Sequence, residues 1–200
     1  MAQKAAGTIM MDETEKTEIR KKTRKSLIWV AIVSIVMFFG GLTSAYVVRQ
    51  AQGDWLYFDI PLVFYISTGC ILLSSITMLL AQRTIKTGDN RKAARYIGAT
   101  LLLGIAFSVL QYVGFLTLFD RGITFTGPGS NVSGSFFIII VFAHAAHVFG
   151  GLVALMVTLV KSLRGAYTAD DHVGIETTAI YWHFLDILWI YLLLFLVFIR

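Results

Sequence analysis

Long apolar runs alternate with short polar segments along the whole chain. Five runs contain few charges, and basic or turn-favouring residues separate each run from the next. Each has roughly 20 residues or more, which as a helix crosses about 30 Å of hydrocarbon at about 1.5 Å per residue. The pattern predicts an all-α integral membrane bundle of five transmembrane helices. We expect these spans near residues 26–48, 61–81, 96–119, 134–160 and 177–199.

Composition supports a membrane protein. Of the 200 residues, 56% are hydrophobic and only 14% are charged, whereas a typical soluble domain is about 25% charged. We therefore expect residues 26–200 to form the transmembrane domain, preceded by a cytoplasmic arm of mixed basic and acidic residues, 1–25. The single cysteine, Cys70, lies inside a predicted span, so an internal disulfide is excluded.

The basic residues predict an orientation. Of the 17 lysines and arginines, all but Arg49, Arg121 and Arg200 fall in the arm or in the loops after the second and fourth spans. By the positive-inside rule, the N-terminus is cytoplasmic and the C-terminus periplasmic. The charge is thus a topology signal and does not indicate nucleic-acid binding. The outer loops then hold a turn-rich segment, 126–131, and an expected interfacial aromatic anchor of Trp55, Tyr57 and Phe58.

Few polar side chains lie at membrane depth. A charged residue there costs roughly 2.5–3.5 kcal/mol on insertion scales, so such residues usually face protein. Counting from the predicted cytoplasmic ends places Gln111, His147 and Asp186 roughly 15–22 Å deep, where the three can form one buried layer. The full set of expected buried polar, packing or lipid-contact residues is Gln111, His144, His147, Trp182, His183, Asp186 and Trp189.

Several interpretations of these residues stay open. His144 and His147 share one helical face and could ligate a metal or haem. Histidine and aspartate could form a proton path, or histidine and arginine could bind a lipid head group. Alternatively, the polar groups pair with one another and fix the helix register. A transition-metal site needs three or four ligands, and the remaining histidine, His172, lies in a loop. We therefore expect no metal site and no catalytic site in this chain.

Small residues on the fourth span predict close helix packing. Ala146, Gly150 and Ala154 are spaced by four residues and form one stripe along that helix. Such stripes allow neighbouring backbones to approach closely in a bilayer.

Three segments of the sequence resemble a known family. Residues 181–189, YWHFLDILW, are similar to the closing motif of subunit III of haem–copper cytochrome c oxidases. Residues 134–137 followed by 144–152 are similar to the second signature of that family, and residues 72–77 also match. The spacing of the five spans resembles the short bacterial form that lacks the first two helices of the seven-helix version.

The resemblance implies an accessory role. It implies a non-catalytic subunit of an aerobic respiratory oxidase in the bacterial inner membrane, which stabilises catalytic subunit I and supports its proton uptake and oxygen reduction. It also implies a V-shaped bundle with phospholipid in its cleft and no haem or copper of its own. The implied partners are subunit I, other oxidase subunits, phospholipids and a larger respiratory supercomplex, with no nucleic acid. A quinol oxidase subunit is the close alternative; a small transporter or channel and a haem-bearing membrane anchor are others.

The sequence departs from the family pattern at two positions. The first span of the family commonly carries an acid after a serine, whereas Ser34 is followed here by Ile35. The third span commonly has a glutamate just after the glutamine position, where this chain has Gly114. Roles that the family assigns to these carboxylates do not carry over to this chain.

Overall fold

Five helices make up the part of the protein that the structure describes. The computed structural model describes residues 2–51, 59–122, 132–169 and 171–199, with side chains at residues 15 and 18–20 and from residue 22 onward. The helices are α1 (Ala2–Gln50), α2 (Leu62–Lys86), α3 (Asn90–Asp120), α4 (Val132–Leu163) and α5 (Val173–Phe198). Each is long and apolar enough to cross a membrane, and the described residues contain no strand, which confirms the predicted fold class. Trp55, Tyr57, Phe58 and residues 126–131 lie outside the described residues.

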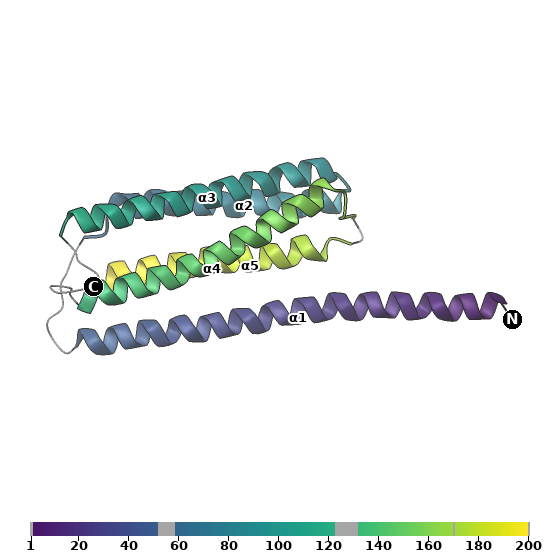
Figure 1. The fold of residues 1–200 in the computed structure, drawn as a ribbon, viewed down its shortest axis with the longest axis horizontal. Helices are drawn as coiled ribbons and strands as arrows, with labels where there is room; N and C mark the ends of the chain where they lie inside the picture. Colours follow the sequence, from purple (N-terminus) through teal and green to yellow (C-terminus); the bar gives the residue numbers. More distant parts are fainter. Residues whose placement is uncertain (1, 52–58, 123–131, 170, 200) are drawn as a thin grey trace.

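Polar residues fix the tight connection between α2 and α3. Gly88 follows α2 with a φ of 82°, a left-handed conformation that glycine adopts without steric cost. Asp89 then caps α3, because its carboxylate accepts a hydrogen bond of 3.0 Å from the Lys92 amide. The Lys92 ammonium, 2.9 Å from Asp89 Oδ2, and this amide hydrogen bond hold the pKa of Asp89 below its usual value. The two helices therefore run antiparallel and side by side (Figure 1).

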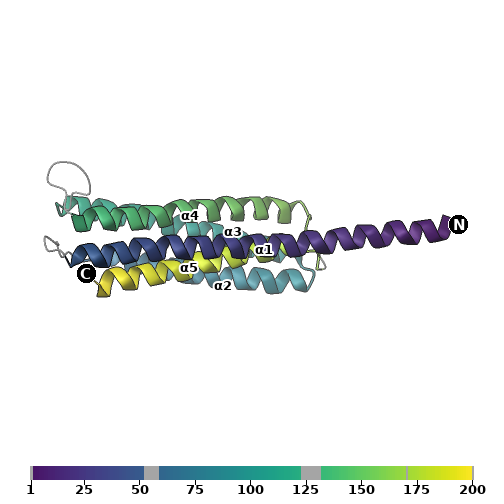
Figure 2. The same ribbon diagram turned by 90° about the horizontal axis from the view of Figure 1, so that it is seen from below.

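The helices are arranged around α5. In Figures 1 and 2, α2 and α3 form one layer, α4 and α5 lie beside it, and α1 runs along the opposite side of α4 and α5. Half of the most apolar window of α5 is buried inside the protein, compared with 17% for α1. α5 is therefore the central helix, whereas α1 lies at the periphery. The N-terminal part of α1 projects beyond the other helices.

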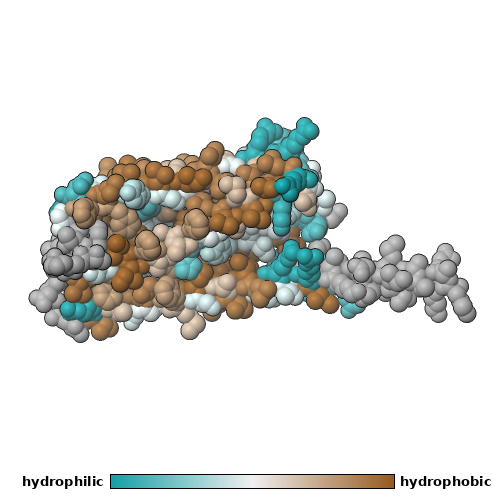
Figure 3. All heavy atoms as spheres, in the orientation of Figure 1, coloured by the Kyte–Doolittle hydropathy of each residue, from teal (hydrophilic) through white to brown (hydrophobic). Residues whose placement is uncertain are grey.

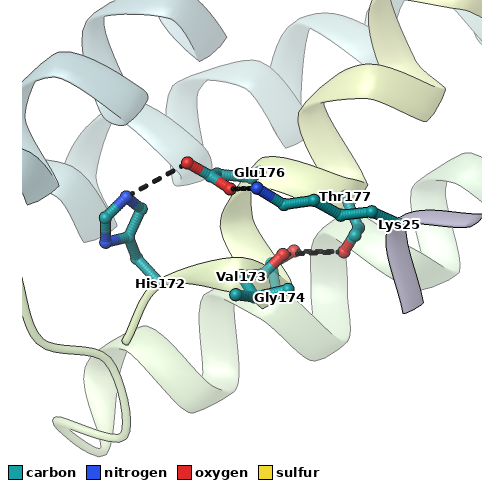
Figure 4. Close-up of polar contacts among 6 residues, drawn as sticks. All are labelled: Lys25, His172, Val173, Gly174, Glu176 and Thr177. Atoms are coloured by element: carbon teal, nitrogen blue, oxygen red, sulfur yellow. Dashed lines mark hydrogen bonds and ion pairs between the residues drawn. The ribbon is translucent and has the colours of Figure 1, made fainter. Parts of the chain in front are cut away.

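α1 is held by one narrow face. Phe39 is 1% exposed, and its ring centroid lies 5.6 Å from that of His147 on α4. The Thr43 and Tyr191 hydroxyls are 3.2 Å apart, which joins α1 to α5. Nearer the N-terminus, Lys25 Nζ lies 2.7 Å from Glu176 Oε2 at the start of α5 (Figure 4). Aromatic packing, the Thr43–Tyr191 hydrogen bond and the Lys25–Glu176 ion pair thus hold α1 on the bundle.

The outer surface of the bundle is apolar. In Figure 3, hydrophobic residues cover most of the visible bundle, and hydrophilic residues gather towards its two ends. Met37, Leu102 and Phe142 are about 70% exposed, at 72%, 69% and 70%. Water does not stabilise such a surface, whereas hydrocarbon does. This belt and the five apolar helices identify a multi-pass membrane protein.

Candidate functional site

Hydroxyl side chains on α2 join three of the predicted residues to this helix. The indole N–H of Trp182 donates to Ser74 Oγ at 2.9 Å. One turn or more further along, the Trp189 indole donates to Thr68 Oγ1 at 3.0 Å, and Gln111 Nε2 donates to Ser67 Oγ at 2.8 Å. The hydroxyl side chains that accept these bonds are Ser67, Thr68 and Ser74. The deep polar groups of α3 and α5 therefore fix the position of both helices against α2.

A serine links the deep aspartate and histidine of α5. The Ser75 hydroxyl donates to Asp186 Oδ2 and lies 3.0 Å from His183 Nδ1. A hydroxyl has one hydrogen to donate, so His183 Nδ1–H is the donor to Ser75. Within the described part of the chain, Asp186 Oδ1 and His183 Nε2 have no hydrogen-bond partner. The cluster fixes the α2–α5 register and leaves two polar atoms unpaired.

The two histidines of α4 lie in different surroundings. His144 is 2% exposed, and its ring stacks on that of Trp189 with centroids 5.3 Å apart. His147 Nδ1 lies 2.7 Å from the Ala143 carbonyl oxygen, and the His147 carbonyl accepts a 3.2 Å bond from the Tyr181 hydroxyl. In the described residues, no group of three histidine, cysteine or acidic side chains is placed to hold a metal ion.

Gln111, His147 and Asp186 do not bond to one another in the described structure. Gln111 bonds to Ser67, His147 to the backbone of its own helix, and Asp186 to Ser75. The similar depths of these residues predicted one shared layer. The helices instead present them to separate partners.

Glycines permit the closest helix contacts around Trp182. A Cβ atom on Gly104 would lie 2.7 Å from the Trp182 ring, and one on Gly151 would lie 2.9 Å from Leu185. The predicted stripe lies beside this contact: Ala146 and Gly150 are exposed, and a Cβ on Gly150 would meet only the Tyr181 hydroxyl, at 3.8 Å. Gly151 therefore makes the close approach within this chain. The predicted packing role of Ala146, Gly150 and Ala154 stays a prediction.

The spacing of serine and threonine residues along α2 indicates the hydrogen-bond partners that the sequence prediction did not include. Ser67 and Ser74 are seven residues apart, as are Thr68 and Ser75, so each pair lies two turns apart on one helical side. Hydroxyl side chains at this spacing, within a long apolar run, mark the side of α2 that meets polar partners on other helices.

A groove with basic residues lies near the N-terminal end of α5. It has a volume of about 490 Å³ and is bounded by α1, α4 and α5, with Arg24 and Lys161 beside the apolar Leu27 and Val157. An adjoining cavity of about 270 Å³ adds Arg20 and one acid, Asp171. Tyr167 lines both, and burial raises the pKa of its phenol above the usual value. The groove thus combines positive charge with apolar walls.

Comparisons with known proteins agree with the resemblance. The family model described as "Cytochrome c oxidase subunit III" matches residues 54–199. The chain is 33% identical over 135 residues to cytochrome c oxidase subunit 3 of Gadus morhua, covering 68% of this chain and 48% of that protein. It is 31% identical over 173 residues to the Corynebacterium diphtheriae protein of the same name, covering 82% of each. The chain therefore spans about half the length of its fish relatives and most of that bacterial one.

Proposed function

This chain belongs to the cytochrome c oxidase subunit III family, and from that membership we propose that it is a non-catalytic accessory subunit of an aerobic haem–copper cytochrome c oxidase. In this role it binds catalytic subunit I, stabilises it, and supports its proton uptake and oxygen reduction. The complex lies in the bacterial inner membrane, with the N-terminus of this chain cytoplasmic. Haem and copper belong to the partner subunits.

The use of the deep polar side chains agrees with this proposal. Gln111 and Trp182 donate to side chains on α2, and Asp186 accepts from one. Paired in this way, these groups hold helices in register inside a bilayer. An accessory subunit needs a bundle of fixed shape beside a catalytic neighbour, and these bonds supply that property.

The proposal is tested by isolating the chain with and without its complex. We expect the tagged chain, extracted in mild detergent, to bring down a haem-containing catalytic subunit in stoichiometric amount. The same chain expressed alone should show no Soret absorbance band. A stoichiometric Soret band in the isolated chain would contradict the accessory role and favour a haem-bearing anchor.

The basic groove supports a proposal for phospholipid. Arg24 and Lys161 flank the apolar runs of α1 and α4, and they line the groove with Leu27 and Val157. A phosphate head group can pair with the two cations while an acyl chain follows the apolar wall. We propose that this groove holds a structural anionic phospholipid between α1 and α4.

Removal of one cation from the groove should release this lipid. A basic side chain near an anionic head group contributes about 1 kcal/mol, so Lys161→Gln should reduce bound anionic lipid about fivefold. Mass spectrometry of lipids that co-purify with the complex measures the change. Arg91→Gln is the matched control, because Arg91 is exposed on the α2–α3 side and does not line the groove. Equal lipid loss in both variants would show that the groove is not the binding site.

A further inference from the structure

A second cavity lies between α3, α4 and α5, and its walls differ from those of the groove. It has a volume of about 200 Å³ and mainly apolar walls, with aromatic rings from Phe107, Phe115 and Trp189. Phe149, 68% exposed, and the exposed Ala145 also line it, so the cavity opens on the outer, lipid-facing side of α4. No charged side chain is among its described lining residues.

Two buried polar side chains in this cavity have unused hydrogen-bonding atoms. His144 is 2% exposed, and neither ring nitrogen has a partner among the described residues. Gln111 is 8% exposed; its amide N–H is used by Ser67, but Oε1 has no partner. A neutral imidazole has one N–H donor and one acceptor nitrogen, and an amide oxygen only accepts. The three atoms without a partner, two on His144 and one on Gln111, are therefore one donor and two acceptors, and leaving such buried groups unpaired costs free energy.

The size and walls of the cavity favour a ring. An apolar cavity of about 150 Å³ in another protein holds a benzene molecule, so about 200 Å³ accommodates a six-membered ring with a small substituent. Aromatic walls pack well against another ring, in stacked or edge-on geometry. Because none of the described lining residues is charged, an ionic ligand would lose its hydration without compensation.

We propose that this cavity binds a lipid-soluble molecule whose six-membered ring carries a hydroxyl group, a ligand of the phenol or quinol class. The hydroxyl donates to Gln111 Oε1, and its oxygen accepts from the His144 N–H. The ring lies against Phe107, Phe115 and Trp189, and the ligand enters from the bilayer past Ala145. This site is separate from the phospholipid groove and does not depend on the proposed accessory role.

The test compares two ligands that differ only in the hydroxyl group. The full oxidase complex in nanodiscs is titrated with 4-pentylphenol and with pentylbenzene, and calorimetry on empty nanodiscs supplies the correction for partition into lipid. We expect saturable binding at one site, at least about tenfold tighter for the phenol, because its hydroxyl forms buried hydrogen bonds that pentylbenzene cannot form. Absence of saturable binding, or equal affinity for the two ligands, would overturn the proposal.

Three variants locate the site. His144→Phe keeps an aromatic ring beside Trp189 but removes both nitrogens, so the preference for the phenol should fall about tenfold. Ala145→Phe places a ring at the opening and should abolish binding of both ligands. His147→Phe is the control, because His147 does not line the cavity. Ala145 is exposed and its substitution leaves the core intact, so undiminished binding by the Ala145→Phe complex would by itself refute the site.

Discussion

Replacement of Trp182 by alanine is expected to lower the free energy of unfolding by about 3–5 kcal/mol. Trp182 is 1% exposed and lies at the centre of the bundle, against Gly104 on α3 and Gly151 on α4. Its indole N–H also bonds to Ser74 on α2. Four helices meet at this side chain, so its truncation leaves a cavity that no single neighbour can fill. Reversible unfolding in mixed micelles, or steric trapping in bicelles, measures the change.

Two further variants test whether the loss of stability comes from the buried packing of Trp182. Trp29→Ala removes the same side chain from α1, where Trp29 is 58% exposed, and should change the unfolding free energy by less than about 0.5 kcal/mol. Trp182→Phe keeps most of the ring volume and removes the indole N–H. The hydrogen bond lost is worth about 0.6 kcal/mol in a bilayer, so this variant should be much milder than Trp182→Ala. Similar losses for Trp29→Ala and Trp182→Ala would show that Trp182 does not organise the core.

Substitution of Gly104 by valine should destabilise the bundle by roughly 1–3 kcal/mol or more, through overpacking. A Cβ atom at Gly104 would lie 2.7 Å from Trp182 and 2.9 Å from Leu152. Both neighbours belong to other helices, so α3 must move away from α4 and α5 to make room. The same unfolding assay measures the change. The variant chain should also bind its partner subunits more weakly if the helix positions shift.

Gly69 on α2 provides the matched control for Gly104. It is exposed, and a Cβ atom there would meet nothing within 4 Å. Gly69→Val introduces the same β-branched side chain into a neighbouring helix and should leave stability close to that of the parent. If Gly69→Val proved as destabilising as Gly104→Val, helix propensity and not the clash with Trp182 would explain the effect.

The number and approximate position of the helices could be predicted from hydropathy, because each span must fill the hydrocarbon thickness. Their ends could not. α3 begins at Asn90, before the predicted start at residue 96. Gly88 follows the end of α2 and Asp89 caps the start of α3, and both lie outside the apolar run. Local hydrogen bonds set helix ends, and hydropathy does not detect them.

The site could be predicted only in part, because depth says nothing about direction around the helix axis. Gln111, Trp182 and Asp186 were identified as deep, but their partners on α2 were not, since serine and threonine are common in spans and carry no charge. Likewise, a spacing of four residues selected Gly150, whereas the neighbouring Gly151 meets Leu185. Which side of a helix faces its neighbours depends on the whole packing arrangement.

The peripheral position of α1 has a consequence for biosynthesis. Among the described residues, α1 packs only against α4 and α5, which leave the ribosome last. The α2–α3 hairpin has a short connection and can close as soon as it is inserted, but α1 must wait in the lipid until its distant partners arrive. During that interval its future contact face is open to a membrane chaperone or to a neighbouring subunit. Assembly of the oxidase can therefore begin on the first helix before this chain has finished folding.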